Sequence, residues 1–245
     1  MTEAFYTFAN PRRFTQLANI LLPWMVAATV LALLVGQYGA WFIAPPDYQQ
    51  GEAIRIKYVH VPAAWMSMMG WVMMSLSALG TLIFRHPLAD VAQKVAAPIG
   101  AVFCAICLIT GSLWGKPMWG TWWVWDARLT SMLVLLLMYL GVIALWRAIE
   151  EPMVAAKAVS IVTLVGAINI PIIKFSVDWW NTLHQPASVL RLDGPTIHSS
   201  MLWPLLVMGL ASGLLFATLM LVGMRTELME RRVRRLMLND ARQAG

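Results

Sequence analysis

Long apolar runs separated by short polar segments dominate this sequence. A membrane-spanning helix needs about 20 mainly apolar residues. Six runs approach or exceed that length, and they predict spans at residues 18–42, 61–84, 95–114, 129–146, 158–175 and 201–224. The first run is too long for the core of a signal peptide and lacks a convincing cleavage site, so we expect it to be retained. The pattern predicts an all-α integral membrane protein whose residues 1–245 form a single polytopic domain.

Composition supports this class. Hydrophobic residues make up 60% of the chain and charged residues only 12%, which is about half the charged fraction of a soluble domain. The mean hydropathy is +0.67. The net charge of +6 does not indicate nucleic acid, because the basic residues lie between the apolar runs and in the C-terminal tail. We therefore expect the chain to lie in a lipid bilayer and to bind no nucleic acid.

The distribution of basic residues predicts the orientation. Six spans place both termini on one side, and that side carries twelve of the eighteen Lys and Arg residues. By the positive-inside rule both termini are cytoplasmic. The tail, residues 225–245, continues as a basic amphipathic helix, which we interpret as an anchor on anionic lipid head groups. Docking of a cytoplasmic partner is the alternative.

The three segments on the outer, periplasmic side are longer than the cytoplasmic loops, and they contain His60, His184 and His198. Function concentrates in loops that a rigid scaffold holds. The remaining histidine, His86, follows Arg85 at a cytoplasmic helix end, where a cation suits the helix dipole. Three histidines on one side make that side the candidate site.

The tryptophan-rich segment at about residues 114–130 lies on the same side. An aromatic belt is the simple interpretation, but belt residues are usually spread over several spans. If the segment is helical, Trp119, Trp122, Trp123 and Asp126 share one face. Gly115, Pro117 and Gly120 are expected to break the third span there. This pattern predicts a flat aromatic shelf at the periplasmic interface.

A flat shelf with nearby histidines suits a flat ligand that carries a metal, and haem iron is held by axial side chains such as imidazole. Haem also carries propionates, for which Arg55 and Arg128 are candidate partners. We expect Asp126 to hold the loop through an indole or an arginine. A zinc site, with three or four clustered ligands, is not apparent. Cys104 and Cys107 have C-x-x-C spacing, but their apolar surroundings favour packing over redox chemistry.

The run WGTWWVWDARLT, residues 119–130, resembles the WWD signature of membrane haem-handling proteins in cytochrome c biogenesis. Over the whole chain, the length, the six spans and one histidine on either side of this run resemble the CcmC family, haem exporter protein C of the bacterial cytochrome c maturation system. The larger members of that superfamily carry more spans than this chain.

The resemblance implies a site and partners. The family's axial histidines match His60 and His184, whereas His198 has no matching role. The WWD contacts match a set of residues comprising Trp114, Trp119, Gly120, Trp122, Trp123, Trp125 and Asp126. The implied ligand is haem b, bound non-covalently at the periplasmic face of the inner membrane. The implied partners are the periplasmic haem chaperone CcmE, the single-span subunit CcmD, and the ABC transporter subunits CcmA and CcmB.

Two other functions stay open at this point. One is a transporter that moves haem across the bilayer, which would need ionisable or helix-breaking residues deep in the spans. The other is a haem-free assembly subunit whose tryptophans bind a protein. The sequence contains no ATP-binding motif, so any energy input must come from a partner, and no independent catalytic group is identified.

Overall fold

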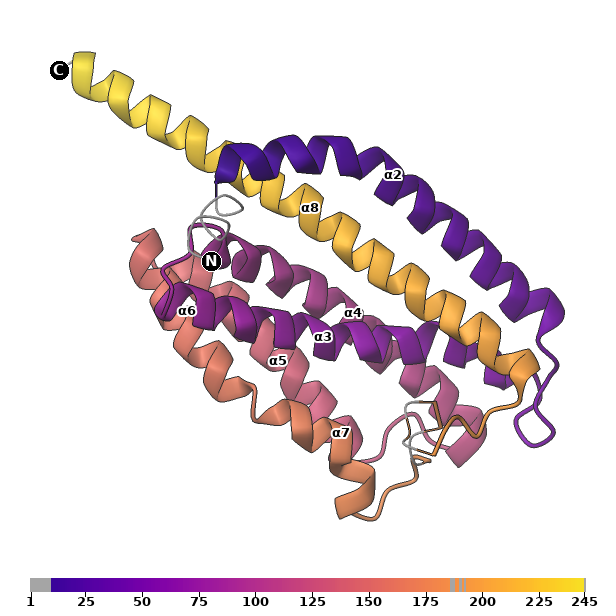
Figure 1. Cartoon of the computed structure of the whole chain (residues 1–245). Coiled ribbons are helices and arrows are strands. Elements are labelled where there is room, and N and C mark those ends of the chain that lie inside the picture. Colours follow the sequence, from indigo (N-terminus) through magenta and orange to yellow (C-terminus); the bar gives the residue numbers. More distant parts are fainter. Residues whose placement is uncertain (1–9, 186–187, 190, 192, 245) are drawn as a thin grey trace.

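The computed structural model describes residues 10–185, 188–189, 191 and 193–244, which form a bundle of helices (Figure 1). The elements are α2 (Pro11–Tyr38), η1 (Gly39–Ile43), η2 (Glu52–Ile56), α3 (Lys57–Leu82), α4 (Ala89–Trp119), α5 (Ala127–Ala148), α6 (Pro152–Gly166), α7 (Asn169–Trp179) and α8 (Ser199–Ala244). Six helical stretches in this part of the chain are long and apolar enough to cross a membrane. The predicted all-α membrane fold with six spans is thereby confirmed.

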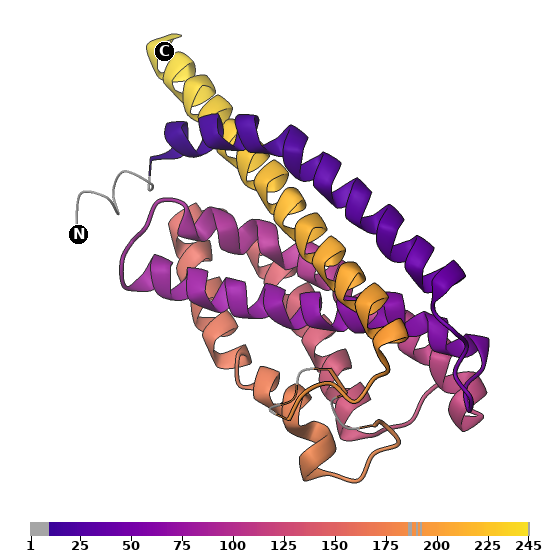
Figure 2. The same ribbon diagram turned by 45° about the vertical axis from the view of Figure 1, so that its right-hand side comes forward.

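Helices α3 and α4 pack against each other and form the centre of the bundle. Helix α2 lies beside α8 and runs in the opposite direction, while α5, α6 and α7 lie on the other side of the centre (Figures 1 and 2). Helix α2 begins and α8 ends at the same end of the bundle (Figure 1). We call the opposite end, where α4 ends and α5 begins, the distal end.

Small residues allow the central helices to approach closely, as is common in membranes, where helix association depends on packing. Gly70 and Gly100 leave the space that the ring of Tyr139 occupies. The Tyr139 hydroxyl donates to the backbone oxygen of Ser67 at 2.7 Å, so this buried polar group is satisfied. The contact ties α5 to α3 and α4 and gives the distal end a rigid base.

Two spans differ from their predicted form. The third was expected to break at Gly115 and Pro117, but α4 continues through both to Trp119. A proline inside a helix removes a single backbone hydrogen bond, and here the helix ends only at Gly120, which takes a left-handed conformation. The fifth span contains the predicted residues 158–175, but α6 and α7 meet within it at a two-residue turn, residues 167–168, where i→i−3 hydrogen bonds interrupt the regular i→i−4 pattern.

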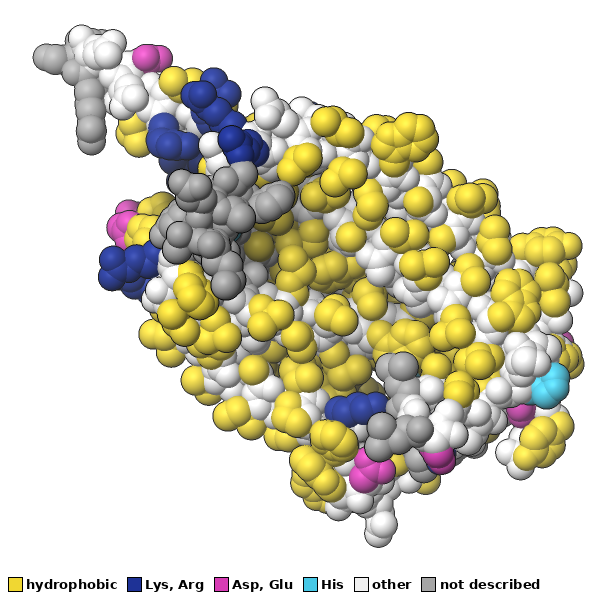
Figure 3. Space-filling view, in the orientation of Figure 1, with side chains coloured by type: hydrophobic (Ala, Val, Ile, Leu, Met, Phe, Trp, Pro, Cys, Tyr) yellow, Lys and Arg dark blue, Asp and Glu magenta, His cyan; other side chains and the backbone are white. Residues whose placement is uncertain are grey.

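Ion pairs fix α8 at the end of the bundle where the helix leaves it. Arg231 donates to Asp90 at 2.6 Å and to Glu227 at 2.8 Å, and Lys94 donates to Glu227 at 2.7 Å. Most of the Lys and Arg side chains visible in Figure 3 gather near this end. The last span and the predicted tail helix are one uninterrupted helix. The side chain of Arg242 and residue Gly245, both in the predicted tail, lie outside the described residues.

Candidate functional site

The tryptophan-rich segment is helical only at its two ends, in α4 and α5, and residues 120–126 between them are not, so the predicted single aromatic face is wrong. Helix α4 ends at Gly120, whose backbone φ is +76°. Residues with a Cβ rarely adopt this left-handed conformation. Residues 121–126 are then non-helical until α5 begins. Asp126 caps α5, because its Oδ1 accepts a hydrogen bond from the backbone N–H of Leu129 at 2.8 Å. Two capping signals in one short segment therefore override the helical spacing of the tryptophans.

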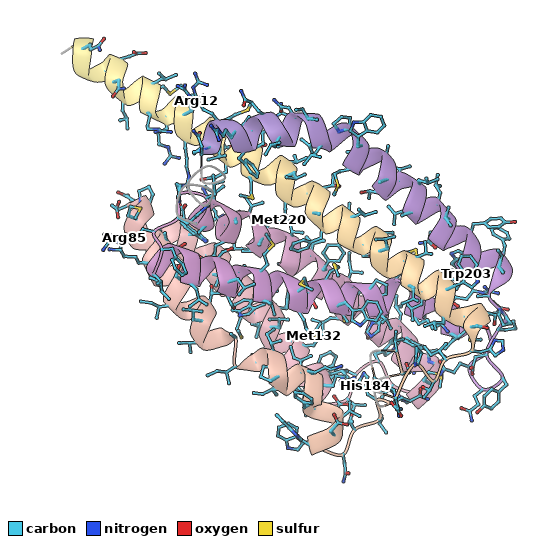
Figure 4. The ribbon with its side chains drawn as sticks, in the orientation of Figure 1. Arg12, Arg85, Met132, His184, Trp203 and Met220 are labelled. Carbon is cyan, nitrogen blue, oxygen red and sulfur yellow. The ribbon has the colours of Figure 1, made fainter. Side chains whose placement is uncertain are left out.

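A cavity of about 330 Å³ lies at the distal end. Its walls come from the first turns of α3 and α5, the last turns of α4, helix α7 and the chain that follows α7. Figure 4 shows two of the lining residues, Met132 on α5 and His184 in the chain after α7. Helices distant in sequence thus enclose one space of a size typical for small-molecule sites.

The tryptophans divide between this cavity and the surface. Trp114, Trp119 and Trp123 line the cavity. Trp122 and Trp125 are 53% and 76% exposed and are not among its lining residues. Trp65 of α3, which the sequence did not single out, also lines the cavity, so four indoles from three backbone segments border it. Trp122 and Trp125 form an exposed aromatic rim beside it.

His60 enters the cavity from the first turns of α3. Its Nδ1 lies 3.0 Å from the backbone oxygen of Cys107 and 3.2 Å from Oγ1 of Thr110. A carbonyl oxygen only accepts, so Nδ1 carries the proton and Nε2 keeps its lone pair. Gly111 provides the space for the ring, because a Cβ at that position would lie 2.9 Å from Cε1 of His60. Nε2 has no hydrogen-bond partner among the described residues.

His184 enters the same cavity from the chain after α7. Its Nδ1 lies 3.1 Å from Oδ2 of Asp126, and the same carboxylate oxygen accepts a hydrogen bond from the hydroxyl of Thr182. The ring also meets Trp119 edge to face, with 4.8 Å between centroids. Asp126 therefore holds the histidine loop, and the expectation that it pairs with an indole or an arginine is wrong.

The electrostatics of this pair fix the imidazole tautomer. Burial lowers the pKa of His184 below its usual value, despite the hydrogen bond to Asp126. Burial alone would raise the pKa of Asp126, but hydrogen bonds from Thr182, Leu129 and His184 hold that pKa below its usual value. At neutral pH a neutral imidazole thus donates from Nδ1 to a carboxylate, and its Nε2 lone pair is available to a ligand.

The two arginines that the sequence suggested as propionate partners, Arg55 and Arg128, lie in different surroundings. Arg128 lines the cavity and donates from Nε to Oγ of Ser176 at 3.2 Å. Arg55 is not among the lining residues; it donates to the backbone oxygens of Ala40 and Ala44 and pairs with Glu52. It therefore joins η2 to the end of the first span.

Several polar residues at the site were missed in the sequence. Gln50 and Lys174 line the cavity, and Gln50 accepts a hydrogen bond from the Trp114 indole at 2.9 Å. Only the position of Gln50 in a long outer segment pointed to it. His198 is exposed, bonds to Ser200 at 2.8 Å, and is not a lining residue.

The donor set limits what the cavity can bind. No group of three or more His, Cys, Asp or Glu side chains that could hold a metal ion occurs within residues 10–185 or the described part of 188–244. The cavity instead offers two imidazoles, His60 and His184, among aromatic side chains, and imidazole is a common axial ligand of haem iron. The fold and the site define a class: a polytopic helical membrane protein with a bis-imidazole aromatic cavity at one end of its bundle.

Comparison with known proteins places the chain within that class. The family model described as Heme exporter protein C matches residues 4–239. A Heme exporter protein C from Bradyrhizobium diazoefficiens is 60% identical over 95% of this chain and 88% of its own length. The proteins of that name from Escherichia coli K12 and Paracoccus denitrificans are 47% and 42% identical, over 95% and 98% of this chain and 94% and 99% of their own lengths. The chain belongs to the haem exporter protein C (CcmC) family, which confirms the resemblance noted in the sequence.

Proposed function

We propose that this protein binds haem b non-covalently at the periplasmic face of the inner membrane and presents it to the haem chaperone CcmE. The observation that carries the proposal is the pair of imidazoles, His60 and His184, in one aromatic cavity. Each has Nδ1 engaged by an acceptor, so each offers Nε2 to an iron atom. Membership in a family whose members are named haem exporters supports haem as the cargo.

Each group of cavity residues has its own role in this proposal. His60 and His184 supply the axial ligands, and two imidazoles leave no open position for oxygen chemistry. Trp114, Trp119 and Trp123 provide apolar walls. Arg128 offers a cation to a carboxylate of the cargo. Haem supplies the vinyl group to which the chaperone attaches, and this chain contributes holding and orientation.

The exposed rim gives the chaperone a place to dock. Trp122 and Trp125 lie beside the cavity with large exposed surfaces, and tryptophan is enriched at binding hot spots. CcmD, CcmA and CcmB complete the complex in this proposal, with energy input from the ABC transporter subunits. The distal end is periplasmic because the basic residues gather at the other end.

Absorption spectroscopy tests the proposal. The protein is purified with CcmE after haem-replete expression, and we expect a six-coordinate low-spin haem spectrum. His60→Ala and His184→Ala should each remove that spectrum, whereas His198→Ala should leave it unchanged. Wild-type protein that carries no haem under these conditions would contradict the proposal, and retained binding of CcmE without haem would favour a haem-free assembly role.

One observation favours transport as a second candidate function. The turn at residues 167–168 makes the helix of a membrane span irregular, and irregular or interrupted helices line the substrate sites of many transporters. Purified protein in sealed vesicles distinguishes the two functions. Haem that crosses the bilayer in the presence of this chain alone supports transport, and haem retained at the outer face supports presentation.

A further inference from the structure

We infer that Lys174 and Arg128 form a cationic wall that receives the haem propionates and so sets the in-plane orientation of the cargo. This inference rests on the proposed function. Lys174 lies on α7, a membrane-spanning segment, and Arg128 lies in the first turn of α5. Both line the cavity that contains the two histidines.

The cationic side chains of the wall line the cavity itself, whereas the two carboxylates that interact electrostatically with Arg128, Asp126 and Asp178, are not among its described lining residues. Its lining residues, drawn from the described part of the chain, include Lys174 and Arg128 but no Asp or Glu. The oxygens of Asp126 accept from Leu129, Thr182 and His184, so this carboxylate is directed toward the histidine loop and the α5 cap. Cationic side chains that line an apolar cavity are complementary to a flat ligand that carries carboxylates on one edge.

Arg128 is fixed against α7 in a way that leaves part of its guanidinium free. Its Nε donates to Ser176, and its Nη2 donates to the backbone oxygens of Ile173 at 3.5 Å and Lys174 at 3.3 Å. Its Nη1 has no partner among the described residues. The same contacts hold α7 against α5, so the two cations belong to one wall.

The ammonium of Lys174 has neither a hydrogen bond nor an ion pair within the described ranges. A charge on a membrane-spanning helix is costly and generally marks a functional position. A lysine can also extend toward a lipid phosphate. Lys174 is exposed, but it borders the cavity beside Arg128, and this position favours a carboxylate of the cargo over a lipid head group.

The wall has a consequence for presentation. The two propionates of haem lie on one edge of the ring, and the two vinyl groups lie on the opposite edge. Propionates held by Lys174 and Arg128 direct the vinyl edge away from α5 and α7. The axial histidines alone would allow the ring to rotate about the axis through the iron, so the cations select one edge for the partner.

Binding of two iron porphyrins to the purified full-length protein tests the inference. One is haem and the other is its dimethyl ester, in which both carboxylates are neutral. We expect wild type to bind the ester roughly tenfold more weakly than haem, as for the loss of charge-assisted hydrogen bonds at a partly exposed site. Equal affinity of wild type for the two porphyrins would overturn the inference without any substitution.

Variants separate the role of Lys174 from a structural one. Lys174→Gln should weaken haem binding about five- to tenfold and leave ester binding within about twofold of wild type, and Lys174→Arg should retain most of the haem affinity. Arg191→Gln is the matched control, because Arg191 is an exposed cation that pairs with Asp193 outside the cavity. Equal weakening of both porphyrins, or no weakening of either, by Lys174→Gln would show that Lys174 has a structural or lipid-binding role. Wild type that binds neither porphyrin would refute the proposed function as well.

Discussion

The carboxylate of Asp126 performs two tasks that one substitution can separate. Oδ1 caps α5 through the backbone N–H of Leu129, and Oδ2 accepts from His184 and Thr182. Asp126→Asn retains an oxygen for the cap, because asparagine and aspartate cap helices equally well. Its amide group then faces Nδ1 of His184 as a donor. The imidazole responds by accepting at Nδ1 and carrying its proton on Nε2, where it can no longer bind iron.

The size of the effect follows from the contacts that change. Removal of a partner that orients a metal-binding histidine typically lowers metal affinity 10- to 100-fold, or about 1.4 to 2.7 kcal/mol. The loss of a hydrogen bond to a charged group, about 1.5 to 3 kcal/mol, gives the same range. We therefore expect Asp126→Asn to weaken haem binding about 10- to 100-fold, while the stability of the apoprotein changes by less than about 0.5 kcal/mol.

Haem titration followed by absorption spectroscopy measures the affinity, and thermal unfolding of the apoprotein measures stability. Asp193→Asn is the control: it neutralises an exposed carboxylate in the chain between α7 and α8, which also contains His184, but Asp193 pairs with Arg191 and not with His184. Asp126→Ala removes both tasks, so it should lower haem affinity and also lower stability by roughly 0.5 to 2 kcal/mol, the value of a lost cap.

Haem affinity of Asp126→Asn within twofold of wild type would refute the reasoning, because the carboxylate would then have no part in orienting the histidine. A fall in haem affinity accompanied by an equal fall in apoprotein stability would also count against it, since the substitution would have damaged the α5 cap.

Three further predictions concern the site and its support. Gly111→Ala should weaken haem binding at least tenfold by displacing His60, whereas Gly141→Ala, on a helix face with nothing within 4 Å, should not; equal binding by the two variants in titrations contradicts this. Because burial holds the pKa of His184 below 6.5, its neutral form persists at pH 6.5, so haem should stay bound there and dissociate only as the pH falls through that lower pKa; a pH titration with a release midpoint above 6.5 contradicts this. Tyr139→Phe should lower thermal stability by about 1 kcal/mol through loss of a buried hydrogen bond to α3, with haem affinity unchanged; an unchanged unfolding temperature contradicts this.

Much of the fold could be predicted from the sequence because the bilayer imposes a simple rule. Backbone polar groups in lipid must bond within their own segment, so each long apolar run becomes a helix. The six spans follow from that rule alone. The turn at residues 167–168 does not, because the apolar pattern continues through it and hydropathy carries no information on where the spacing of backbone hydrogen bonds changes.

The sequence by itself also determined the candidate residues: the indoles of the tryptophan-rich segment and two of the outer histidines, His60 and His184. It could not determine their arrangement. Helical spacing placed the tryptophans on one face, but the φ of Gly120 and the cap at Asp126 make residues 120–126 an irregular loop.

Only the tertiary structure decided which groups share the cavity. Lys174 and Gln50 line it and Arg55 does not, although the sequence predicts all three on the same side of the membrane. The hydrogen bond between His184 and Asp126 joins residues 58 positions apart in sequence, and the one between His60 and the Cys107 carbonyl joins residues 47 positions apart. Contacts across such separations depend on how the helices pack, because local sequence sets the side chains that are available and packing sets which of them meet.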